Sequence, residues 1–317
     1  MLHILHINDT DTHQPAGWAP AAATIRHLRQ RGQCDLLLHA GDLTLGGESG
    51  DHLVGLLNDL GFDAITPGNH EFDRGLAVLR RQLAAFSGAV LCANASGFTQ
   101  SMTIERRGMR IALTGVLLPE LNLLQPPRNL EGMELTAPET ALRSLVPELR
   151  RQADMVVVIS HCGLDADREL ARAVPGIDLI VGGHSHHLLT APVREGATLI
   201  VQAGAFGEYV GCVSVDASGQ LGAQVIPTAP ADPPPVSTST SPIGYTETDL
   251  RTDDYARETP LGNLTADLMR QAAGTDFALL RCSSVRNAYP PGPLTADDVR
   301  GMNFCGIDSV VRLELTG

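Results

Sequence analysis

Residues 2–13 read Leu-His-Ile-Leu-His-Ile-Asn-Asp-Thr-Asp-Thr-His, a short apolar run that changes abruptly into a polar and acidic one. The run Leu2–Ile7 has the length and apolar character of a buried strand. The residues that follow it include carboxylates and an imidazole, which are metal-ligand types. This stretch therefore predicts a strand whose carboxyl end carries chemistry.

The same order of apolar strand, polar loop and amphipathic helix recurs along the chain as far as Pro227. The predicted strands are Leu2–Ile7, Asp35–Ala40, Ala64–Pro67, Val90–Ala93, Met155–Ser160, Asp178–Val181 and Leu199–Gln202. The predicted helices are Ala21–Gln30, Asp51–Leu60, Leu76–Ala85 and Glu139–Gln152. Met102–Arg106 and Met109–Gly115 flank Arg107-Gly108 and predict a hairpin, so the sheet should be mixed. Alternating strands and helices predict an α/β layered domain with its loops gathered at the strands' carboxyl ends.

A second region follows a break in composition. The stretch from Pro227 to Pro242 is rich in Pro, Ser and Thr, which predicts an extended linker. Thr259 is then placed to cap a helix that has Pro260 at its first position. The apolar alternation at Val311, Leu313 and Leu315 predicts a last strand. We expect a catalytic domain over 1-228, a linker over 229-244 and a partial second domain over 245-317.

The composition excludes several classes of protein. A net charge of -13 argues against binding nucleic acid or an anionic membrane through a basic face. No apolar run approaches the ~20 residues that cross a bilayer. The first residues carry neither a basic start nor an apolar signal core, so the chain as written is expected to be cytoplasmic. The six cysteines form no CxxC pair and are expected to be reduced thiols.

Five loops that follow predicted strands contain metal-ligand residue types. They are Asn8-Asp9-Thr10-Asp11-Thr12-His13, Gly41-Asp42, Gly68-Asn69-His70-Glu71-Phe72-Asp73, Ser160-His161 and Gly182-Gly183-His184-Ser185-His186-His187. Singly, most have an ordinary structural interpretation as turns, and we interpret Asn94 in that way. Together they place carboxylates, an amide oxygen and imidazoles at one sheet edge, a set that suits Mn, Fe, Zn or Co. Two such cations ~3.5–4 Å apart clamp the oxygens of a phosphoryl displacement, so the set predicts a two-metal phosphoesterase.

In this order, the motifs resemble the calcineurin-like metallophosphoesterase superfamily. More narrowly, Ile4–Asp9 together with Gly68–Asp73 is similar to the 5'-nucleotidase / UDP-sugar hydrolase / 2',3'-cyclic phosphodiesterase family. Val201-Gln202-Ala203-Gly204, followed by Gly207, is also similar to that family. The resemblance covers nearly the whole chain. It implies a four-layer α/β/β/α sandwich with mixed sheets, followed by an α+β C-terminal domain that holds the nucleoside and is partial here.

The resemblance also implies a ligand set divided between two cations. It assigns Asp9, Asp11 and His186 to one metal, Asn69, His161 and His184 to the other, and Asp42 as the bridge. Mn is the cation expected first, with Zn, Co, Fe or Mg as alternatives. The implied nucleophile is a metal-bound water or hydroxide.

Two further residues match the family's catalytic pair. His70 matches the histidine that stabilises charge on the phosphoryl oxygens or protonates the leaving alkoxide, and Asp73 matches the partner that orients it.

The first loop departs from the family pattern. The family reads Asp-x-His there, whereas this chain reads Asp9-Thr10-Asp11 with His13 two residues later. Either Asp11 replaces the imidazole or His13 takes its place. A carboxylate at this position would favour Mn or Mg over Zn.

The tail resembles the start of the family's nucleotide-binding domain. Glu258–Leu264 matches its opening helix, Arg286 an arginine at the substrate, and Phe304 the first of two aromatics that hold the base. Ser283-Ser284 stand where the family has glycines, Arg281 stands in place of an asparagine, and the second aromatic would lie beyond Gly317. Core packing of Phe304 and an ion-paired or solvated Arg286 are equally supported alternatives.

The expected function is metal-dependent hydrolysis of phosphate esters, with release of phosphate from nucleotides by a 5'-nucleotidase-type reaction and weak selectivity among nucleotides. The alternative within enzymes is a phosphodiesterase of 2',3'-cyclic nucleotides or sugar nucleotides. The alternative from another class is a non-catalytic relative that binds metal or a partner. The expected partner is a small phosphate ester or nucleotide, with self-association through the incomplete C-terminal domain as a further option.

Overall fold

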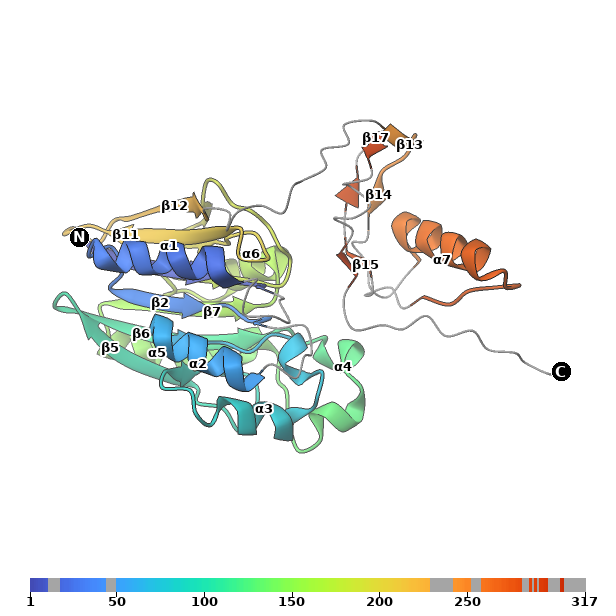
Figure 1. Cartoon of the computed structure of the whole chain (residues 1–317). Coiled ribbons are helices and arrows are strands. Elements are labelled where there is room, and N and C mark those ends of the chain that lie inside the picture. The colour runs from blue at the N-terminus through green and yellow to red at the C-terminus, as the bar shows by residue number, and fades with distance from the viewer. Residues whose placement is uncertain are drawn as a thin grey trace. The chain divides into compact units, whose positions relative to one another are not determined.

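The structure is a computed structural model that describes residues 1–10, 18–43, 50–228, 242–251, 258–280, 285–286, 288–289, 291–295 and 303–304. Its contacts divide the chain into two compact units, Met1–Ala231 and Asp232–Gly317 (Figure 1). Each unit is described by itself.

The first unit alternates strands and helices. Its strands are β1 (Leu2–Ile7), β2 (Leu36–His39), β3 (Ala64–Ile65), β4 (Ala89–Val90), β5 (Ser101–Arg106), β6 (Met109–Leu117), β7 (Met155–His161), β8 (Leu179–Gly182), β9 (Val193–Glu195), β10 (Thr198–Val201), β11 (Tyr209–Val215) and β12 (Leu221–Pro227). Its helices are α1 (Ala19–Gln30), α2 (Gly50–Leu60), α3 (Leu76–Leu83), α4 (Leu121–Leu124), α5 (Pro138–Gln152) and α6 (Leu164–Ala173), with short 3-10 helices η2 (His70–Phe72) and η3 (Pro127–Leu130). Each predicted strand and helix before Pro227 is present, with ends shifted by a few residues.

These strands form two six-stranded sheets, ordered β12-β11-β1-β2-β3-β4 and β5-β6-β7-β8-β10-β9. The strands β1 to β4 run parallel in the first sheet, and β6, β7, β8 and β10 run parallel in the second. Antiparallel strands β11, β12, β5 and β9 complete the edges. The expectation of mixed sheets is confirmed.

The sheets pack face to face and each carries helices on its other face (Figure 1). Leu36 and Leu38 of β2 face the same core as Val157 of β7. Leu37, between them, points to the other face and packs with Leu57 of α2. On the second sheet, α5 and α6 pack in the same way against β7 and β8. The result is the expected α/β/β/α order, in which strands buried on both faces read as continuous apolar runs.

The second unit has one described helix, α7 (Pro260–Ala273), beside short strands. The Thr259 side chain accepts a hydrogen bond from the Gly262 N–H at 3.2 Å, which confirms the predicted cap. The strand pairs are β13 (Pro242–Thr246) with β17 (Gly292–Thr295), β14 (Leu250–Arg251) with β16 (Ala288–Tyr289), and β15 (Val285–Arg286) with β18 (Asn303–Phe304). Strand β13 thus begins inside the predicted linker, whose residues 229–241 lie outside the described ones, as does the predicted last strand. Among the described residues, no helix has the length and apolar character to span a membrane.

Candidate metal centre

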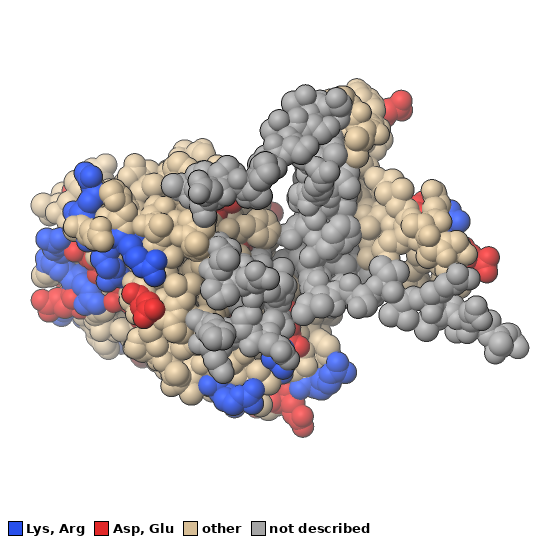
Figure 2. All heavy atoms as spheres, viewed as in Figure 1, with Lys and Arg blue, Asp and Glu red and all other residues tan. Residues whose placement is uncertain are grey.

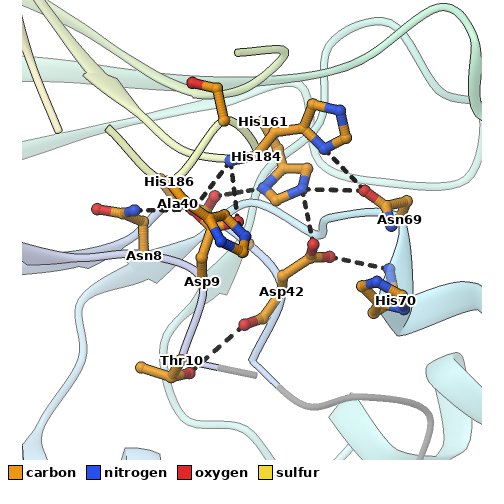
Figure 3. Close-up of polar contacts among 12 residues, drawn as sticks. Asn8, Asp9, Thr10, Ala40, Asp42, Asn69, His70, His161, His184 and His186 are labelled. Atoms are coloured by element: carbon orange, nitrogen blue, oxygen red, sulfur yellow. Dashed lines mark hydrogen bonds and ion pairs between the residues drawn. The ribbon is translucent and has the colours of Figure 1, made fainter. Parts of the chain in front are cut away.

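The predicted ligands lie at the carboxyl ends of neighbouring strands in both sheets (Figure 3). They follow or end five strands: Asp9 after β1, Asp42 after β2, Asn69 after β3, His161 at the end of β7, and His184 and His186 after β8. Since parallel strands in a sheet end at one edge, residues up to 177 positions apart meet there. Asp11 and His13 lie outside the described residues, so the choice between them stays a prediction.

The larger of two ligand groups is built around His161. Its Nε2 lies 3.2 Å from Asp42 Oδ2 and 3.3 Å from Asn69 Oδ1. The same Asn69 oxygen lies 3.0 Å from Nδ1 of His184. One ligand atom each from Asp42, His161 and His184 lies within 4.8 Å of the others, a spacing that could hold a metal ion.

The smaller group joins Asp9 and His186. Nε2 of His186 lies 3.4 Å from Asp9 Oδ1. The backbone N–H of His184 donates to both carboxylate oxygens of Asp9 at 2.9 Å, and Asn8 Nδ2 donates to Oδ2 at 2.7 Å. Asp9 is therefore oriented by Asn8, directly after β1, and by the loop after β8.

Four of these residues have a left-handed backbone. The φ angles are 47° at Asp9, 53° at Asp42, 74° at His184 and 57° at His186. Side chains larger than glycine rarely adopt this region, and holding one there costs on the order of 1 kcal/mol or more. Such strain gathers at functional sites, where the surrounding contacts determine the side-chain direction.

A glycine permits the close approach of two ligand loops. A Cβ placed on Gly68 would lie 2.2 Å from Asp42 Oδ1 and 2.7 Å from His161 Cε1. Any larger residue would therefore push the third loop away from the second. The glycine in Gly68-Asn69-His70 is required by packing at the site.

Burial sets the electrostatics of this edge. Burial alone would lower the pKa of His161, but the charge and hydrogen bond of Asp42, together with Asp9 and the Ala40 carbonyl, outweigh it and raise that pKa to about 9. For Asp9, burial raises the pKa, and the larger opposing effect of His186 and His161 leaves it below the usual value. Burial and the charge of Asp42 raise the pKa of Glu71 to about 7. Several buried carboxylates in one place are costly unless cations balance them.

The residues fit a divalent metal centre. Two buried carboxylates, one amide oxygen and three imidazoles form the mixed oxygen and nitrogen set that first-row cations bind. His161 Nδ1 lies 2.7 Å from the carbonyl oxygen of Ala40, which orients its Nε2 towards the other ligands. A second hydrogen bond of this kind is what metal-binding histidines make.

The predicted catalytic pair lies beside the predicted ligands. His70 Nδ1 is 2.8 Å from Asp73 Oδ2, and the His70 backbone N–H donates to Asp42 Oδ1 at 2.8 Å. Because a carboxylate accepts, His70 Nδ1 donates in this contact. Gln125 Nε2 donates to Asp73 Oδ1 at 2.5 Å, and Asn129 Nδ2 donates to Gln125 Oε1 at 3.1 Å. The imidazole is thus fixed by a chain of three polar side chains.

Sequence reasoning missed several residues of this site. Asn8, Gln125 and Asn129 are described above. Glu71 accepts the backbone N–H groups of Asp42 at 2.9 Å and Leu43 at 2.8 Å, which ties the second loop to the third. Its place inside the Gly68–Asp73 motif was the available signal. Gln125 and Asn129 have no such signal, because only tertiary packing brings them to Asp73.

Asn94 behaves as interpreted from the sequence. It is buried, and its side chain bonds the backbone at Leu117 and Thr136. It is therefore a structural residue.

The predicted substrate residues of the second unit are described only in their backbone. Arg286 pairs with Asn303, and Val285 pairs with Phe304, so the two predicted residues lie on neighbouring strands. Their roles stay predictions.

Comparisons with known proteins agree with this architecture. Residues 2–188 match the family model described as calcineurin-like phosphoesterase, and residues 236–317 match that of the 5'-nucleotidase C-terminal domain. The chain is 27% identical to the endonuclease YhcR of Bacillus subtilis (strain 168) over 94% of this chain and 29% of that protein. It is 26% identical to the trifunctional nucleotide phosphoesterase protein YfkN of the same organism, over 100% of this chain and 27% of that protein.

The same likeness extends to solved structures. A 5'-nucleotidase precursor from Thermus thermophilus has a TM-score of 0.70 at 25% identity, over 95% of this chain and 73% of that one. The chain spans less than a third of the two Bacillus relatives. The first family match, in contrast, covers more than half of this chain and contains every described residue of the predicted ligand set. The chain belongs to the calcineurin-like phosphoesterase family.

Proposed function

We propose that this chain is a two-metal hydrolase of phosphate esters and that nucleotides are its substrates. The observation that carries the proposal is the convergence of six ligand-type side chains from five strand ends beside the His70–Asp73 pair. Turn chemistry alone would account for single loops. It does not account for carboxylates and imidazoles gathered at one place, where Asp9, Asp42 and His184 are buried on left-handed backbone.

The described residues fall into two ligand groups. Asp9 and His186 would hold one cation, and Asn69, His161 and His184 the other, with Asp42 between them. When bound, two such cations would lower the pKa of an attacking water and neutralise charge on the phosphoryl oxygens. Mn is the proposed cation, because a first-loop carboxylate at Asp11 would add a hard oxygen ligand.

The protein's own acid is His70. Asp73 accepts from its Nδ1, so the charged imidazole carries its other proton on Nε2. This proton is available to a leaving alkoxide, and the carboxylate partner stabilises the charged form before transfer. The chain from Asn129 through Gln125 to Asp73 holds the ring in one orientation.

The substrate class is supported by the second unit. Its match to a 5'-nucleotidase C-terminal domain and the names of two relatives favour nucleotides over other phosphate esters. The alternative substrates, 2',3'-cyclic nucleotides and sugar nucleotides, use the same chemistry. One relative is named an endonuclease, so a short DNA strand belongs among the test substrates.

The direct experiment is a phosphate-release screen of chelated protein reloaded separately with Mn, Mg, Zn or Co. The substrates are nucleoside 5'-monophosphates, cyclic nucleotides, sugar nucleotides, a nucleoside-free ester and a short single-stranded DNA. Cyclic nucleotides, sugar nucleotides and DNA need a phosphatase step added before phosphate is detected. We expect the highest turnover with Mn and a nucleoside monophosphate. No hydrolysis of any ester with any metal would favour the non-catalytic alternative.

Selectivity for the nucleoside is tested by Arg286→Ala and Phe304→Ala. If these residues contact the nucleoside, kcat/KM for AMP falls while that for the nucleoside-free ester is unchanged. Loss of base stacking would cost ~1–3 kcal/mol. Unchanged AMP kinetics in both variants would return the two residues to structural roles.

A further inference from the structure

The loop between β10 and β11 contains a bulky residue in a conformation that favours glycine. Phe206 has a φ of 57°, close to the 71° of Gly204 and the 69° of Gly207. A left-handed phenylalanine is an outlier, whereas glycine adopts the same region without strain. Phe206 is 42% exposed, so core burial does not account for this conformation either.

The contacts of Phe206 lead to the metal centre. Its ring meets the imidazole of His186 edge to face, with ring centroids 5.5 Å apart and planes at 90°. This is the geometry that aromatic rings prefer. Its backbone N–H donates to the carbonyl oxygen of Asp9 at 2.7 Å. Phe206 therefore touches both described residues of the smaller ligand group.

The rest of the loop leads to the same place. Asn8 Oδ1 accepts from the Ala203 N–H at 2.9 Å, and Asn8 Nδ2 donates to the Gly204 carbonyl at 2.6 Å. That Nδ2 also donates to Asp9 Oδ2 at 2.7 Å. The loop thus holds the Asp9 backbone directly, and it holds Asn8, whose side chain in turn donates to the Asp9 carboxylate.

We propose that Phe206 is a positioning residue for one of the two metals, which it serves by fixing the imidazole of His186 and the backbone of Asp9. The backbone of Phe206 is held in a strained conformation while its ring makes this contact. The inference rests on the metal assignment proposed above. It adds a selective effect: Phe206 supports the Asp9–His186 group and leaves the Asn69–His161–His184 group intact.

The test is Phe206→Gly in the full chain, which removes the ring and relieves the backbone strain. We expect the affinity for one of two Mn ions to fall ~10–100-fold, the usual effect of losing a partner that orients a ligand. The other ion should bind as in the wild type. The melting temperature of the chelated variant should be no lower than that of the wild type. Isothermal titration and metal analysis after gel filtration measure the two binding steps.

Arg107→Gly is the matched control. Arg107 also has a left-handed φ, of 53°, but it lies in the hairpin turn between β5 and β6 and pairs with Asp35 before β2. It should bind both ions normally. Phe206→Tyr keeps the ring and should also bind both.

Two further variants identify the step that is lost. His186→Ala should weaken the same ion, so adding Phe206→Gly to it should cause little further loss. Asn69→Ala should weaken the other ion, so its combination with Phe206→Gly should weaken both.

Normal binding of both ions by Phe206→Gly, or an equal loss at both steps, would overturn the inference. If Phe206→Gly does not fold, Phe206→Asn gives the same measurement, because asparagine tolerates a left-handed backbone. A wild-type chain that binds no divalent ion would instead overturn the proposed function.

Discussion

The two ends of the parallel strands use similar residue types in different surroundings. At the amino ends, an aspartate directly precedes each of β2, β3, β7 and β8, and each of these aspartates pairs with an arginine. In strand order, the pairs are Asp35–Arg107, Asp63–Arg106, Asp154–Arg110 and Asp178–Arg150. Arginine and acidic side chains gather at this end of the first unit (Figure 2). At the carboxyl ends, the carboxylates of Asp9 and Asp42 are fully buried and face histidines.

The difference separates a structural use of charge from a functional one. Exposed ion pairs contribute ~0–1 kcal/mol each and tolerate change. Buried carboxylates on left-handed backbone lower stability unless a cation balances them. The carboxyl edge therefore has the charge and the geometry of a site completed by a ligand.

The largest expected effect comes from the same substitution made at each end. Asp42→Asn removes the carboxylate between the ligand groups, and metals supply several kcal/mol of transition-state stabilisation. At 1.36 kcal/mol per tenfold, phosphate release should fall ~10³-fold or more. Asp63→Asn, before β3, should leave turnover near that of the wild type. Equal losses in both variants would show that the two ends do not differ in function.

His70→Asn tests the acid beside the ligands. We expect kcat to fall ~10²–10⁴-fold, the range for a positioned acid or base, while both metals remain bound. Kinetics and metal analysis on one preparation separate the two roles. Loss of metal, with activity per bound metal unchanged, would make His70 a ligand instead.

Asp167, in the helix that follows the carboxyl end of β7, should make stability depend on pH. This residue of α6 is fully buried and accepts a hydrogen bond from Ser160, and burial raises its pKa to about 7. The folded pKa lies above the unfolded one, so the associated stability is present at low pH and is lost as pH rises to about 7. Asp167→Asn lacks this loss. The free energy of unfolding of Asp167→Asn minus that of the wild type should therefore increase by on the order of 2 kcal/mol from pH 5 to pH 8. Urea unfolding at both pH values measures this, and a constant difference would contradict it.

The smallest effect is expected at the arginine end. Arg106 and Asp63 form a partly exposed pair at 2.8 Å. A double-mutant cycle with Arg106→Ala and Asp63→Asn should give a coupling of ~0.2–1 kcal/mol that weakens with added salt. A coupling of several kcal/mol would instead show that the Arg106–Asp63 pair behaves as a buried ion pair.

Local patterns predicted most of the first unit and its site, because buried parallel strands and their polar ends are continuous in sequence. They did not predict β11 or α6. Gly211 weakens the strand signal of β11. The fold nevertheless requires glycine there, because a Cβ would lie 2.0 Å from His6 Nε2 of the neighbouring strand. Asp167 breaks the apolar face of α6, yet it is buried. In both cases a contact made by the folded chain, with His6 for Gly211 and with Ser160 for Asp167, decides a residue that local patterns assign otherwise.

The same limit applies within the site. Motif residues such as Asn69 and His70 were predicted because each follows a strand. Gln125 and Phe206 were not, since their contacts with Asp73 and His186 arise from loops that only the fold brings close.

Metal content measured together with turnover shows whether hydrolysis depends on two bound cations. The chain is stripped with a chelator, assayed for phosphate release from AMP, and reloaded with increasing Mn while bound metal is counted. We expect no turnover in the stripped chain and recovery that saturates at two ions per chain. Full turnover with no metal bound would contradict it.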